Sequence, residues 1–156
     1  MRLNIVAIGQ RMPSWVSSGW TEYSRRFSRG FSLNLREVPA IKRNRNADID
    51  SIRQREGEAL LAAVSASSYL VALDELGNQW STVELSAHLT EWMENSRDVT
   101  FLIGGPDGLS AACRDRAEVC WSLGKLTLPH PLVRVVLAEQ LYRAWTITQN
   151  HPYHRD

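Results

Sequence analysis

Several short runs of this chain are apolar at nearly every position, without the polar–apolar alternation of a half-exposed strand. The clearest runs cover residues 3–8 (LNIVAI), 69–74 (YLVALD) and 98–105 (DVTFLIGG). Strands that are apolar at nearly every position are typically buried on both faces, as in parallel sheets covered by helices. The sequence therefore predicts an α/β domain.

Segments with a helical spacing of apolar residues separate these runs. Asp48, Ser81 and Ser110 can each cap a helix, and Glu84 completes a capping box with Ser81. The spacing predicts helices over roughly 13–30, 48–64, 81–93, 110–120 and 130–145, and further strands at 33–38 and 121–128. Both cysteines, Cys113 and Cys120, fall on the fourth helix. Alternating elements in 156 residues predict a single domain, residues 1–156, with a mostly parallel sheet flanked by helices.

Positive charge is concentrated near the amino end, although the net charge of the chain is only +1. Residues 1–60 hold eleven basic and six acidic residues, and ten of the eleven are arginine. Arginine suits bidentate contacts to phosphate, and a basic segment favours a polyanionic partner. A solvated surface is the alternative interpretation. The candidates for phosphate contact are Arg25, Arg26, Lys42, Arg43 and Arg45.

Two unusual segments stand at expected carboxyl ends of strands. Residues 104–110 (GGPDGLS) place three glycines in five positions, which lets a ligand approach the backbone closely. Residues 123–131 (LGKLTLPHP) set His130 between two prolines, and such a rigid, extended backbone suits the edge of an adenine ring. Because ligands bind beyond the carboxyl ends of parallel strands, we expect a small-molecule site here. A tight turn and a plain helix start are the alternatives.

Several familiar sites are missing from the sequence. The glycine-rich segment lacks the Gly-Lys-Ser/Thr of a P-loop, and no GxGxxG follows the first strand. The cysteines form no zinc pattern, and His151 and His154 lack a third ligand, so no metal is expected. The longest uncharged run, residues 59–73, is shorter than the roughly 20 apolar residues that span a membrane. The first ten residues do not resemble a signal peptide, so we expect a cytoplasmic protein without a membrane partner.

Taken together, IGGPDGLS at 103–110 and the stretch from WSLGKLTLPHP to the ending HPYHR closely resemble the bacterial large-subunit ribosomal RNA methyltransferase H family. The start MRLNIVAIGQRMPSWV and the loop KRNRNADI extend the resemblance over essentially the whole chain. Members of this family are small SPOUT-class enzymes that methylate N3 of a pseudouridine in 23S rRNA.

The resemblance implies a SPOUT-type sheet whose C-terminal part is threaded into a trefoil knot, and the knot builds a pocket for S-adenosylmethionine. It also implies a homodimer in which the tail of one chain completes the site of the other, and 23S rRNA or the ribosome as partner. The positions that match the family's cofactor site are Leu73, Gly104, Leu123, Gly124, Lys125, Leu126, Thr127 and Leu128.

Methylation of N3 requires that its proton leave, and a general base would help. We rank His154 first and His130 second for this role, with Tyr153 and Arg155 positioning the base or a phosphate. Six tryptophans, more than we expect one small core to hide, also predict that some of them lie in a two-fold interface.

Two other function classes remain as alternatives. A non-catalytic rRNA-binding or ribosome-associated module would keep the basic segment but need no ligand pocket. A nucleotide-binding oxidoreductase would use the glycine-rich loop, but the sequence lacks its fingerprint and its ribose-binding acid.

Overall fold

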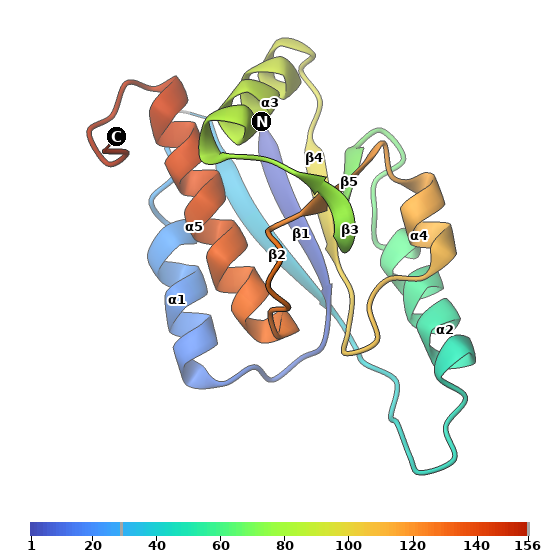
Figure 1. Cartoon of the computed structure of the whole chain (residues 1–156). Coiled ribbons are helices and arrows are strands. Elements are labelled where there is room, and N and C mark those ends of the chain that lie inside the picture. The colour runs from blue at the N-terminus through green and yellow to red at the C-terminus, as the bar shows by residue number, and fades with distance from the viewer. Residues whose placement is uncertain (29, 156) are drawn as a thin grey trace.

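A single five-stranded parallel sheet forms the centre of the computed structural model, which describes residues 1–28 and 30–155. The strand order is β2-β1-β4-β3-β5, and all four neighbouring pairs are parallel (Figure 1). This confirms the α/β class expected from the apolar runs. The strands are β1 (Arg2–Ile8), β2 (Ser32–Val38), β3 (Tyr69–Gln79), β4 (Val99–Ile103) and β5 (Val119–Ser122).

Helices cover both faces of this sheet, as predicted (Figure 1). One layer holds α1, α3 and α5, in which α5 packs between the other two, and the opposite layer holds α2 and α4. The helices are α1 (Ser14–Ser24), α2 (Ile49–Ala62), α3 (Thr82–Glu94), α4 (Ala111–Arg116) and α5 (His130–Thr148).

The sheet separates two apolar cores. The two sides of β1 contribute to different cores. Leu3 and Ile5 pack in the core under α1, α3 and α5, whereas Val6 and Ile8 pack in the core under α2 and α4. All four are fully or almost fully buried. A strand buried on both faces cannot alternate polar and apolar residues, which explains the continuous runs in the sequence.

The predicted helix caps are confirmed. The side chain of Asp48 accepts a hydrogen bond from the Ser51 N–H at 3.2 Å, and Ser110 accepts one from the Cys113 N–H at 3.3 Å. Ser81 and Glu84 form the full capping box, at 3.1 Å and 2.6 Å. Each cap satisfies backbone N–H groups that the first turn leaves without a partner.

Four predicted element boundaries are wrong. Helix α1 ends at Ser24 rather than near Gly30, and only the first two residues of 121–128 belong to a strand. Cys120 lies in β5, not on the fourth helix, because that helix ends at Arg116. Strand β3 continues past Asp74 to Gln79, through a register shift against β5. Gly77 permits that pairing, because a Cβ there would lie 2.6 Å from the carbonyl carbon of Cys120.

The six tryptophans divide between the core and the surface, and their place in a two-fold interface stays a prediction. Trp92, Trp121 and Trp145 are buried, and Trp20 and Trp80 pack partly buried against the same core. Trp121 stacks on Trp80 with ring centroids 5.1 Å apart, so aromatic packing accommodates them. Only Trp15, which is 55% exposed, resembles an interface residue.

Candidate functional site

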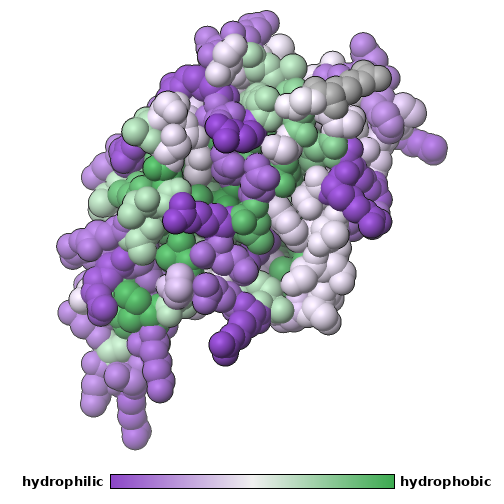
Figure 2. Space-filling model, turned by 180° about the vertical axis from the view of Figure 1, so that it is seen from behind, coloured by the Kyte–Doolittle hydropathy of each residue, from purple (hydrophilic) through white to green (hydrophobic). Residues whose placement is uncertain are grey.

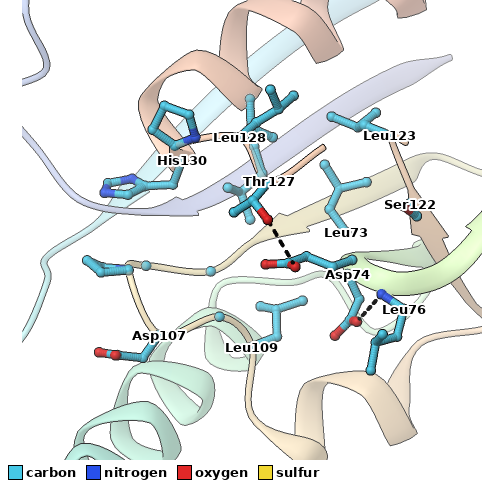
Figure 3. A pocket seen from close by; sticks show the side chains of 18 of the residues that line it. Leu73, Asp74, Leu76, Asp107, Leu109, Ser122, Leu123, Thr127, Leu128 and His130 are labelled. Carbon is cyan, nitrogen blue, oxygen red and sulfur yellow. Dashed lines mark hydrogen bonds between the residues drawn. The ribbon is translucent and has the colours of Figure 1, made fainter. Parts of the chain in front are cut away.

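A cavity of about 790 Å³ opens beside the middle of β3 and at the carboxyl ends of β4 and β5 (Figure 3). Its walls come from residues 73–76 of β3, from the glycine-rich loop after β4 and from the segment that leads from β5 into α5. A parallel sheet brings these strand ends to one edge, which is where ligands of α/β proteins bind.

Most residues predicted for the cofactor meet in this cavity. Lys125 is the exception: its side chain is exposed and lies outside the lining. The sequence patterns at the strand ends therefore converge in space. The seven predicted residues that line the cavity are Leu73, Gly104, Leu123, Gly124, Leu126, Thr127 and Leu128.

The glycine-rich loop closes on itself. Gly105 and Gly108 form an antiparallel bridge, and the Gly108 N–H donates to the Gly105 carbonyl at 3.0 Å. A Cβ on Gly104 would lie 2.6 Å from the carbonyl carbon of Gly108, so glycine is required there by the loop's own backbone. We expected the approach of a ligand to require this glycine, and the loop's own backbone requires it instead. Gly108 has a positive φ of 77°, which glycine adopts without strain.

The segment from Leu123 to Pro129 is irregular and bends at Leu123, Lys125 and Leu126, so it is not the extended backbone predicted for it. The Ser122 hydroxyl donates to the Gly124 carbonyl at 2.9 Å and accepts from the Gly124 N–H at 3.2 Å. The Thr127 hydroxyl donates to Glu75 across the cavity at 3.5 Å (Figure 3). These bonds fix a stretch of backbone that belongs to no helix or strand.

The cavity joins apolar walls to charged groups of both signs. Leu73, Leu109 and Leu128 supply apolar surface that suits a flat ring. The charged residues are Arg53, Asp74, Glu75, Asp107 and Arg114. Sequence reasoning marked Asp74 only as a strand end and missed the two arginines, since each lies on a helix with no local motif. Such a cavity fits a ligand that carries an apolar ring and charges of both signs.

His130 also lines the cavity, at the start of α5. Burial lowers the pKa of His130 from its usual 6.5, and the positive charges of Arg134 and Arg43 lower it further. The ring is therefore neutral at pH 7 and can accept a proton. Its Nδ1 is buried and has no hydrogen-bond partner among the described residues.

One turn along α5 from His130 lies a fully buried arginine, Arg134. Arg134 donates to Glu37 at 2.6 Å and to the carbonyls of Gly9 and Ile8 at 2.7 Å and 3.2 Å. The ion pair ties α5 to the end of β2, and the two carbonyls tie it to the end of β1. A buried charge needs such partners, and here they anchor the helix that carries His130.

The other predicted catalytic residues lie at the far end of α5 (Figure 1). The Tyr153 hydroxyl donates to Glu139 at 3.1 Å, and its ring packs edge-on against Tyr142 with centroids 4.7 Å apart. Burial, with the Glu139 hydrogen bond, raises the pKa of Tyr153 to about 12, so the phenol keeps its proton. His154 is half-buried, and its Nδ1 has no hydrogen-bond partner in the described chain; Arg155 is exposed.

The predicted phosphate contacts fall into two groups. Arg25 and Arg26 follow α1, where both pair with Glu22, and Arg26 also lies over the Tyr153 ring at 5.8 Å. Lys42, Arg43 and Arg45 belong to the loop between β2 and α2, residues 39–48, which we call the basic loop. Seen from behind, hydrophilic side chains project where this loop lies (Figure 2).

Within the basic loop, the three basic residues differ. Lys42 and Arg45 are exposed, and neither has an ion-pair partner within residues 1–28 and 30–155. Arg43 instead pairs with Glu56 at 2.7 Å and with Asp107 at 2.6 Å. Only the first two present an unengaged charge to a polyanion.

Among the residues that the structure describes, no three His, Cys, Asp or Glu side chains gather as metal ligands would. None of the helices in the described chain combines the length and the apolar character that crossing a bilayer requires.

Comparison with known proteins adds full-length relatives. The chain is 56% identical over 155 residues to the ribosomal RNA large subunit methyltransferase H of Methylococcus capsulatus, covering 99% of this chain and 100% of that protein. It is 52% identical over 156 residues to the protein of that name from Thioalkalivibrio sulfidiphilus, covering 100% of both.

The fold has a solved counterpart as well. A probable methylase family protein from Haemophilus influenzae superposes with a TM-score of 0.60 at 11% identity, over 99% of this chain and 70% of that one. The family model described as "Predicted SPOUT methyltransferase" matches residues 1–154. The chain, with its cavity at the strand ends and its glycine-rich loop, therefore belongs to the SPOUT methyltransferase family.

Proposed function

We propose that this chain transfers a methyl group from S-adenosylmethionine to N3 of a pseudouridine in 23S rRNA. Full-length identity of 52–56% to two ribosomal RNA large subunit methyltransferases H carries the proposal. The cavity supports it, because seven of the eight residues matched to the family's cofactor site line it together. The substrate places the protein with ribosomes, in the cytoplasm.

The residues of the cavity fit S-adenosylmethionine. The ligand combines an adenine ring, a sulfonium and an amino acid with both charges. Leu73 and Leu128 supply apolar surface for the ring, and the backbone from Leu123 to Leu128 supplies polar groups for its edge. When bound, the cofactor supplies an activated methyl group, so the protein has mainly to align donor and acceptor.

The acceptor half of the reaction needs a group that removes the N3 proton. His130 is neutral at pH 7 and stands beside the cavity, whereas His154 lies on the tail. We keep the tail residue as the first candidate and His130 as the second. Tyr153 keeps its proton across the physiological range, so it positions the substrate rather than acting as the base.

The two candidates lie apart within a single chain. His130 begins α5, whereas Tyr153, next to His154, packs against Glu139 and Tyr142, which lie about 14 and 18 Å further along the helix at 1.5 Å per residue. A homodimer in which the tail of one protomer reaches the cavity of its partner would bring them together. The knot implied by the family resemblance also stays a prediction.

One experiment tests the activity directly. In a strain that lacks the gene, mass spectrometry of 23S rRNA should find one pseudouridine short of a methyl group, and the wild-type gene should restore it. Tritium transfer from labelled S-adenosylmethionine to ribosomes of that strain separates an enzyme from the alternative, a non-catalytic rRNA-binding module. Binding of rRNA without transfer of label would reject the proposal.

A further inference from the structure

Arg43 sits where three segments from distant parts of the sequence meet. It belongs to the basic loop, and its guanidinium donates to that loop's own Ile41 carbonyl at 3.0 Å. It also pairs with Glu56 of α2 at 2.7 Å and with Asp107 of the glycine-rich loop at 2.6 Å. One side chain thus connects the basic loop, a helix and a wall of the cavity.

The two carboxylates that hold Arg43 differ in burial. The side chain of Glu56 is only 4% exposed, so Arg43 neutralises a charge that would otherwise be buried alone. Asp107 is 29% exposed and lines the cavity (Figure 3). The pair with Glu56 therefore stabilises the fold, while the pair with Asp107 joins two loops at the surface.

The surroundings leave Arg43 little freedom to turn toward RNA. Its side chain is 22% exposed, and Gly105 lies beside it, because a Cβ there would make an ordinary contact of 3.6 Å with the guanidinium. Arg45, two residues along the same loop, is exposed. A phosphate could recruit Arg43 only by displacing two carboxylates, one of them buried.

We propose that Arg43 is a positioning residue that locks the glycine-rich loop to the basic loop through Asp107, so that donor binding and RNA binding are coupled. The inference rests on the proposed function. Lys42 and Arg45 hold phosphate from one end of this connection, and the cofactor contacts the loop at its other end. By linkage, each ligand then strengthens binding of the other by the same factor.

The decisive variant is Asp107→Asn, because it removes the negative charge that pairs the two loops and leaves the Arg43–Glu56 pair intact. Asp107→Glu keeps the carboxylate and should rescue. Asp115→Asn is the matched control, since Asp115 is an exposed acid on α4 outside the cavity lining. Thermal unfolding of each variant should show that the fold persists.

Calorimetry with S-adenosylhomocysteine, with and without unmethylated ribosomes, measures the coupling. For wild type and Asp115→Asn we expect ribosomes to tighten binding by roughly 5-fold or more, the usual lower range of such couplings. Asp107→Asn should reduce this factor to about one, and Asp107→Glu should restore most of it. Arg45→Ala should weaken ribosome binding while S-adenosylhomocysteine alone binds as in wild type.

Arg43→Ala distinguishes this role from a direct contact between Asp107 and the ligand. If the two residues act through their ion pair, Arg43→Ala combined with Asp107→Asn should lower S-adenosylhomocysteine affinity no further than the more severe single variant. Additive losses, or coupling that survives in Asp107→Asn, would overturn the inference. A wild-type protein that neither binds S-adenosylhomocysteine nor methylates would instead overturn the proposed function.

Discussion

The two ends of α5 carry the two halves of the proposed site, and they differ in how much one chain supplies. At its amino end, His130 joins a cavity built from three strand ends and two loops. At its carboxyl end, the tail of residues 149–155 follows the helix, and Tyr153 packs back against α5. The cavity proposed for the donor is therefore formed by a single protomer, whereas the tail proposed for the acceptor half packs on the outside of α5.

The difference follows from what holds each region. The cavity is held by the sheet, by the bonds of Ser122 and Gly124 and by the bridge in the glycine-rich loop. The tail is held mainly through one side chain: Tyr153 donates to Glu139, and Arg143 lies 4.9 Å above its ring. Tyr153 therefore keeps an otherwise polar tail against the helix. Variants at the two ends should separate donor binding from turnover.

The largest effect should come from the tail. We expect His154→Ala to lower turnover by roughly 10²–10⁴-fold, the usual contribution of a general base, while S-adenosylhomocysteine binds as in wild type. The measurement is tritium transfer to unmethylated ribosomes, beside calorimetry. His151→Asn is the control, because it changes an exposed tail histidine and keeps an acceptor for the Tyr153 N–H.

The same variant tests whether the tail acts on the partner's cavity. Mixed dimers of His154→Ala with a chain defective in donor binding should regain activity, since one of their two sites combines an intact cavity with an intact tail. Turnover that stays at the level of the separate variants would place both halves within one chain.

A second large effect should appear at the cavity. Gly104→Ala puts a Cβ 2.6 Å from the Gly108 backbone, so the loop must deform, and donor affinity should fall by about 10-fold or more. Calorimetry checks this, with Gly30→Ala as a comparison outside the cavity lining: its Cβ meets nothing within 4 Å, and its cost is the strain of a positive φ of 81°. Wild-type affinity in a folded Gly104→Ala protein would separate this loop from the donor site.

A moderate effect on ribosome binding is expected from the basic loop. Replacing Lys42 and Arg45 by alanine should weaken ribosome binding and lower its salt dependence by a slope of about 0.7–0.9 per lost phosphate contact. Donor affinity in the absence of RNA should not change. If the salt slope of the double variant equals that of wild type, neither residue touches phosphate.

A smaller effect concerns pH and the buried end of α5. The pKa of His130 is lowered in the folded chain, so below pH 6.5 the unfolded chain binds a proton that the folded chain resists. This contribution makes the protein less stable as the pH falls from 6.5. The melting temperature of His130→Gln should therefore drop less between pH 7.5 and 5.5 than that of wild type. Equal losses would show that His130 is accessible to protons in the fold.

The smallest effect should come from Tyr153→Phe. It removes the hydrogen bond to Glu139, worth about 1 kcal/mol, and keeps the ring against Tyr142. Turnover should fall several-fold, far less than in His154→Ala, because the tail stays docked but less firmly. Loss equal to that of His154→Ala would give the hydroxyl itself a part in the reaction.

Local interactions could be predicted from the sequence. The caps at Asp48, Ser81 and Ser110 connect groups a few residues apart, and each stands where the pattern placed it. The apolar runs gave the parallel sheet, because a strand buried on both faces leaves no room for polar residues. The cavity followed from the rule that strand ends meet at one edge, which brought Leu73, Gly104 and Leu128 together.

The tertiary structure alone decided the contacts between distant segments. Arg134 and Glu37 are 97 residues apart, and Arg43 and Asp107 are 64 apart. A charge pattern cannot distinguish an arginine free for phosphate from one held by a carboxylate that the fold brings beside it. The same holds for the tail, whose distance from its own cavity depends on the length and direction of α5. The sequence determines which residue types are present. The way the fold brings distant segments together decides whether each one lines a pocket, forms an ion pair or stays on the surface.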